Sequence, residues 1–140
     1  MEESPVVTTP ESPRSGGEVL SRVSTALVGL HKEYYGKGPT KAKTFMVDDT
    51  FVCLLHGGLT VVEKTLIAAG RASAVHDVRQ SFQSAMKEPF VRIVEDITGR
   101  KVIAYLSQIH TDPDIAAEIF VLEPGGPVIG HGAWEEDLET

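Results

Sequence analysis

Residues 36–70, GKGPTKAKTFMVDDTFVCLLHGGLTVVEKTLIAAG, decide the fold, because chemical signals mark nearly every boundary within them. The glycines and the proline at the start of this segment end a preceding helix, since glycine suits a left-handed cap and proline cannot continue the helical ladder. Two apolar and β-branched runs then flank Asp48 and Asp49, which are turn formers, and predict a β-hairpin. After a glycine pair, Thr60 and Glu63 have the spacing of a capping box and predict a helix start.

Helical periodicity continues on both sides of this segment. Upstream, apolar residues recur every three or four positions on one face, at Val19, Val23, Leu27, Leu30 and Tyr34. Downstream, Gly70 ends a short helix, and a longer one follows whose apolar face is wide enough to cover a sheet. That face consists of Val75, Val78, Phe82, Met86, Phe90, Ile93 and Ile97. Pro89 interrupts the longer pattern, so we expect a kink or a break near Glu88.

Two more strands complete the predicted domain. Gly99 ends the longer helix, and Lys101–Leu106 and Ile115–Leu122 follow, joined across a turn that contains Pro113. The element order is α-ββ-αα-ββ, and hairpins favour antiparallel pairing. We therefore predict an α+β fold with two layers: a four-stranded, largely antiparallel sheet with helices packed on one face.

The second face of this sheet has no predicted cover. Its candidate apolar residues are Phe45, Val47, Val52 and Leu54. If they are left exposed, a second copy of the chain would bury them, so we expect a homodimer.

Composition limits the class of protein. A chain of 140 residues with 41% hydrophobic and 24% charged residues is an ordinary soluble domain. No apolar run approaches the ~20 residues of a membrane-spanning helix, so we expect no direct membrane insertion. The acidic, proline-bearing start does not resemble a secretory signal, and the single Cys53 excludes an internal disulfide, so we expect a cytoplasmic protein. Residues 17–124 form the predicted domain, with a disordered tail at 1–16 and a flexible acidic tail at 125–140.

The charge is concentrated in those tails. Of the net charge of −7, the last eight residues carry −4 and the first 16 carry −2, which leaves a nearly neutral body. Such a body has no general attraction for phosphate backbones, so we expect no nucleic-acid binding. The only tryptophan, Trp134, stands beside the acidic cluster, and this segment is either a docking peptide or an unstructured end.

No set of residues has the pattern of a catalytic or metal site. Asp48 and Asp49 are expected to face water in a turn, and the five histidines lack the short spacings of metal ligands. We therefore predict no catalytic residues, no metal and no cofactor. The four arginines of the helical region are expected to solvate helix surfaces, namely Arg71, Arg79, Arg92 and Arg100.

An anion site is the one ligand-binding possibility that the residues suggest. His56 ends a strand next to a glycine pair and a helix start, and three lysines lie in the preceding loop and strand. The candidate ligand-binding residues are Lys37, Lys41, Lys43 and His56.

Several segments together resemble the small bacterial MpsC-like family, formerly a domain of unknown function. They are LHKEYYGKGPTKAKTFMVDD, LLHGGLTVVEKTL, VRQSF, EDITGRKVIAYLS and DPDIAAEIFVLEP. The resemblance covers about Gly17 to Pro124. The resemblance implies a part in a membrane-potential-generating system linked to cation or inorganic-carbon transport, whose membrane-embedded components are other chains. It brings no catalytic residues with it.

The leading hypothesis is a non-enzymatic, cytoplasmic accessory or regulatory domain that binds itself and a membrane-protein complex. The alternative is a sensor that binds a small anion or another small ligand.

Overall fold

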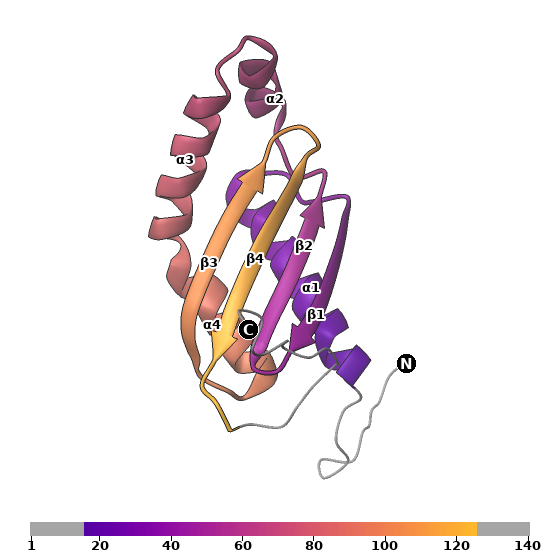
Figure 1. Ribbon diagram of the computed structural model, residues 1–140. Coiled ribbons are helices and arrows are strands. Elements are labelled where there is room, and N and C mark those ends of the chain that lie inside the picture. The colour runs from indigo at the N-terminus through magenta and orange to yellow at the C-terminus, as the bar shows by residue number, and fades with distance from the viewer. Residues whose placement is uncertain (1–15, 126–140) are drawn as a thin grey trace, which may run out of the picture.

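The computed structural model describes residues 16–125, which form four helices and four strands (Figure 1). In chain order they are α1 (Gly16–Tyr35), β1 (Lys41–Val47), β2 (Thr50–His56), α2 (Val61–Ala68), α3 (Ala72–Ala85), α4 (Lys87–Thr98), β3 (Val102–His110) and β4 (Ile115–Leu122). The predictions for the tails concern residues outside this range, apart from Gly16, which is the first residue of α1, and Gly125.

The sheet joins two hairpins through a long-range pairing. Its strand order is β1-β2-β4-β3, and every neighbouring pair is antiparallel. In Figure 1, α1 and α4 lie behind the sheet, α3 stands along the β3 side, and α2 lies beyond one end of the strands. No helix covers the front face in this view. The predicted α+β architecture, with its four-stranded antiparallel sheet and helices on one face, is confirmed.

The core lies between the sheet and the two helices behind it. Side chains alternate along each strand, so every second residue of β2 faces this layer. The fully buried members with the largest side chains include Phe51, Phe120, Leu27, Met46, Leu55 and Leu122. A smaller cluster of Leu59, Val75 and Ile109 anchors the α2–α3 arm to the end of the sheet.

The predicted helix break occurs at Met86, which closes α3 and precedes α4. Pro89 is thereby the third residue of α4, where a backbone N–H would have no helical partner and its absence costs little. β3 continues to His110, four residues beyond the predicted end at Leu106. The polar residues Ser107 and Gln108 hid this extension from the sequence pattern.

Within the part of the chain that the structure describes, no helix is both long and apolar enough to pass through a membrane.

Candidate functional site

Three of the four predicted ligand-binding residues lie together on the uncovered face of the sheet. Lys41 pairs with His56 across the β1–β2 ladder, and Lys43 lies two residues further along β1 on the same face. Lys37 lies in the loop before β1, and its Nζ donates a hydrogen bond to the carbonyl of Gly57, the residue after His56. The structure therefore gathers Lys41, Lys43 and His56 on an exposed surface, and Lys43 also lines an open cavity of about 550 Å³ between α1 and β1.

The surface that carries them, called here the open face, consists of the outward-pointing residues of all four strands. The registers align these residues in rows across the sheet. One row is wholly apolar and is called the apolar row: Phe45, Val52, Ile119 and Leu106. The row at one end contains Lys41, His56, Ile115 and His110, and with Lys43 it forms what we call the basic end.

The two ends of the open face differ in charge. Glu118 is the only acidic residue in the four strands, and it points to the other side, into the core. The turn beside the basic end adds Asp112 and Asp114, but Asp114 already accepts a hydrogen bond from the Leu59 N–H at 3.0 Å. The opposite end of the strands carries exposed acidic groups at Asp48 and Glu123, which outnumber the one exposed lysine there, Lys101, whose carbonyl accepts from the Glu123 N–H. The apolar row therefore lies between a basic end and an acidic end.

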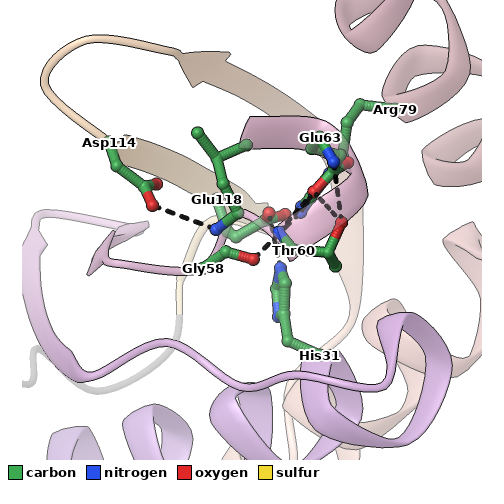
Figure 2. Close-up of polar contacts among 8 residues, drawn as sticks. His31, Gly58, Thr60, Glu63, Arg79, Asp114 and Glu118 are labelled. Atoms are coloured by element: carbon green, nitrogen blue, oxygen red, sulfur yellow. Dashed lines mark hydrogen bonds and ion pairs between the residues drawn. The ribbon is translucent and has the colours of Figure 1, made fainter. Parts of the chain in front are cut away.

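A second polar group lies behind the sheet, buried in the core. Glu118 is 1% exposed and accepts hydrogen bonds from the Tyr105 hydroxyl and, at 2.9 Å, from Ser107 Oγ. His31 Nε2 lies 3.4 Å from the same carboxylate, and His31 Nδ1 donates to the Leu27 carbonyl at 2.8 Å (Figure 2). The carboxylate thus links α1 to β3 and β4.

The third polar group joins α2 to α3. Arg79 donates to both carboxylate oxygens of Glu63, at 2.6 and 2.7 Å, and to the Gly58 carbonyl at 3.1 Å (Figure 2). Its guanidinium carbon also lies 3.9 Å from the centre of the Tyr35 ring. The expectation that Arg79 solvates a helix surface was wrong, because Arg79 is 3% exposed. Its helical position was predicted, but the carboxylate, aromatic ring and carbonyl that surround it were not.

The same carboxylate completes the predicted capping box of α2. Glu63 accepts from the Thr60 N–H at 2.8 Å, and the Glu63 N–H donates to Thr60 Oγ1 at 3.2 Å. Burial alone would raise the pKa of Glu63, but the hydrogen bonds from Arg79 and Thr60 outweigh it and hold the pKa below its ordinary value. Glu63 therefore stays ionised as the partner of Arg79.

The buried hydroxyl and thiol groups are poor nucleophiles. Burial, followed by the Glu118 charge, raises the pKa of Tyr105 far above its ordinary value. Burial also raises the pKa of Tyr35, and the neighbouring Arg79 offsets only part of that effect. Cys53 is fully buried, and burial raises its pKa to about 11, so the thiol stays protonated at neutral pH.

A small cavity separates the two buried polar groups. Its volume is about 10 Å³, and its lining includes His31, Arg79 and Asp114. A space of this size is at the lower limit for a single water molecule. Within residues 16–125, no three side chains of the metal-ligating types come together. The arrangement is suited to holding α1, α3 and the sheet in one geometry.

The acidic turn between β1 and β2 also differs from its prediction. Asp48 is exposed as expected, with a φ of 52° that favours Asp and Asn over most side chains. Asp49, however, forms an ion pair at 2.5 Å with Arg100, whose side chain is 7% exposed. Arg100 therefore fastens the turn to the start of β3 instead of solvating a helix.

Comparison with known proteins gives the family. A profile described as "Na+-translocating membrane potential-generating system (MpsC)" matches residues 15–124. The chain belongs to the MpsC family. The match covers all the elements from α1 to β4, so the resemblance drawn from the sequence is confirmed.

Two similar proteins of Bacillus subtilis are described as uncharacterized. YrhF of Bacillus subtilis (strain 168) is 31% identical over 97 residues, which cover 67% of this chain and 79% of the relative. YbcI of the same organism is 28% identical over 102 residues, covering 71% and 77%. No solved structure matches this chain.

Proposed function

We propose that this MpsC-family chain is a non-enzymatic, cytoplasmic accessory or regulatory component of a membrane-potential-generating system, and that it acts through protein association on its open face. The first occupant of that face is a second copy of the chain, and the resulting dimer is the form that engages the membrane-protein complex. The family description supports the link to the system, and the open face supports the mode of action.

The apolar row is the observation that carries this proposal. It crosses all four strands, and Leu106 within it remains 54% exposed, as does the neighbouring Ile103. Burying apolar surface contributes about 25 cal/mol per Å², so an uncovered row of this kind favours association. Sheets that pack face to face lie about 10 Å apart with their strands nearly aligned. Four adjacent strands offer a surface of the right shape for such packing.

Charge selects one orientation of the two copies. If two open faces stacked with their strands in the same sense, the two basic ends would meet and repel. In a two-fold arrangement with the strands in opposite senses, the basic end of each copy lies against the acidic end of the other. When the apolar rows are superposed, Lys41 of each copy comes beside the turn that carries the partner's Asp48. The dimer we propose is therefore two-fold symmetric, with the strands of the two open faces antiparallel, and is called here the antiparallel dimer.

The buried polar groups support a non-enzymatic role. The ionisable side chains that approach one another behind the sheet bind each other, as Arg79 binds Glu63 and His31 lies beside Glu118. The space between them, about 10 Å³, has no room for a substrate. These contacts join α1, α2, α3 and the sheet, which is a structural role that needs no reaction.

The test of association compares two exposed apolar residues. Leu106→Glu places a charge in the apolar row, and Val78→Glu places the same charge on α3, where Val78 is 62% exposed. Sedimentation equilibrium should find a dimer for the wild type and Val78→Glu, and a monomer for Leu106→Glu. A monomeric wild type, or a dimer lost only in Val78→Glu, would contradict the proposal.

The link to membrane potential needs a separate measurement. Cells of the source organism that lack this chain should show a reduced sodium-dependent membrane potential with a potentiometric dye. Wild type and Val78→Glu should restore the potential, and Leu106→Glu, at equal cellular abundance, should not. An unchanged potential in cells that lack the chain would remove this role.

A further inference from the structure

We propose that the acidic C-terminal segment of one chain, residues 133–140, binds the basic end of the partner's open face and clamps the dimer. This inference rests on the proposed antiparallel dimer. The segment carries Glu135, Glu136, Asp137 and Glu139, which give it a charge of −4, and it also contains Trp134. The segment itself lies outside the residues that the structure describes.

The basic end has the complementary chemistry. Lys41, Lys43 and His110 are exposed there, and His56 pairs with Lys41 across the ladder. Within residues 16–125, no ion pair engages Lys41 or Lys43. An acidic segment therefore meets two lysines that no ion pair within the described part of the same chain engages, and in the dimer the partner's Asp48 adds one negative charge beside Lys41. Several such contacts together stabilise an interface more than a single exposed pair does.

The position of the chain exit decides which copy receives the segment. β4 starts at the basic end and finishes with Leu122 at the acidic end, so the chain leaves the sheet beside Lys101 and remote from its own Lys41 and Lys43 (Figure 1). In the antiparallel dimer, this exit lies beside the partner's basic end. The ten residue steps from Gly125 to Glu135 can span at most about 33 Å, which is ample for that short path.

Binding to the chain's own basic end is the competing arrangement. The segment would have to run back along β4, about 23 Å for seven residue steps. On that path it would lie over the apolar row, which the second copy covers in the dimer. Because one surface cannot hold both, the two arrangements predict opposite effects of the segment on dimer formation.

Trp134 supplies a direct readout, because it is the only tryptophan in the chain. Its fluorescence anisotropy should rise as the full-length chain is concentrated through the monomer–dimer transition, beyond the rise caused by slower tumbling. The doubly substituted Lys41→Gln, Lys43→Gln chain, held at a concentration where it is equally dimeric, should lack the additional rise. Equal anisotropy in the two dimers would overturn the clamp.

The sign of the effect on affinity separates the two arrangements. Replacing all four acidic residues of the segment by their amides should weaken dimerisation about tenfold at low salt and have little effect near ~0.5 M salt, where exposed charges are screened. Stronger dimerisation would show that the segment covers its own open face, and no change would show that it does not bind there. Either result overturns the clamp, whereas loss of the dimer in Leu106→Glu tests the open face itself.

Mixed dimers test contact between copies. One chain keeps the acidic segment but carries Lys41→Gln and Lys43→Gln, and the other ends at Gly125 and keeps both lysines. A clamp between copies makes the mixed dimer more stable than the average of the two homodimers, after correction for the twofold statistical factor. Stability equal to that average would exclude a contact between copies.

Discussion

The two faces of the sheet differ in how completely the described residues cover their side chains. Behind the sheet, even a carboxylate is fully accommodated, because Glu118 has two hydroxyl donors and His31 beside it. In front, the apolar row crosses four strands without cover from any described helix. The inner face is complete within one chain. The outer face is left uncovered by the described residues, and the proposed second copy would bury it.

This contrast assigns different roles to neighbouring residues. Glu118 and Ile119 are adjacent in β4 and point to opposite faces, so one belongs to the folded core and the other to the proposed interface. Substitutions on the inner face should change the stability of the monomer. Substitutions on the outer face should mainly change association.

The largest effect should follow from Glu118→Ala. The substitution leaves the Tyr105 and Ser107 hydroxyls and His31 without their acceptor in a buried site, so we expect a loss of about 3 kcal/mol or more in the free energy of unfolding. The matched change, Ile119→Thr, keeps a β-branched residue on the open face and should cost about 1 kcal/mol or less. Urea unfolding of dilute, monomeric protein measures both. Similar losses would show that the two faces contribute alike to monomer stability.

Arg79→Met should produce the next effect, about 2 kcal/mol, because it removes the partner of Glu63 and leaves that carboxylate partly buried. The pH dependence gives an independent check. The pKa of Glu63 is lower in the folded state, so its contribution is present above the unfolded pKa near ~4.5 and is lost as the pH falls through the folded value. Wild-type stability should fall more steeply than that of Arg79→Met as the pH drops below about 5. Parallel pH profiles would contradict the coupling.

Local signals in the sequence were sufficient for the elements but not for the polar contacts between them. The capping box at Thr60, the helix end at Gly99 and the β1–β2 turn depend on residues close together in the chain, and each was predicted. His31 and Glu118 are 87 positions apart and meet only because β4 pairs with β2 beneath α1. Arg79 likewise meets a carbonyl 21 positions away. Such contacts require the strand order, which no local pattern supplied.

The open face was partly predictable, because alternation along a strand is a local property. Phe45 and Val52 were expected on an uncovered surface, and the register places them side by side. Ile119 and Leu106, which complete the apolar row, were missed because the central pairing of the sheet was unknown. The grouping of Lys41, Lys43 and His56 on this face was also hidden until the β1–β2 register aligned them.

The smallest effect should follow from Thr60→Ala. α2 contains no fully buried residue, so its stability depends on its capping box and on the packing of Leu66 and Ile67 against the Leu59 cluster. Losing the Thr60 hydroxyl removes the acceptor for the Glu63 N–H and should cost about 1 kcal/mol. Since α2 lies beyond the end of the sheet, we expect the loss to be confined to residues 61–68, where hydrogen exchange should become faster.

Thr65→Ala is the matched control, because Thr65 Oγ1 only donates back to the Val61 carbonyl within the same helix. Alanine at that position should leave exchange unchanged or slower, since alanine favours the helix. If the two alanines had equal effects, the capping box would not stabilise α2, and the arm would depend on Leu59 and Arg79 instead.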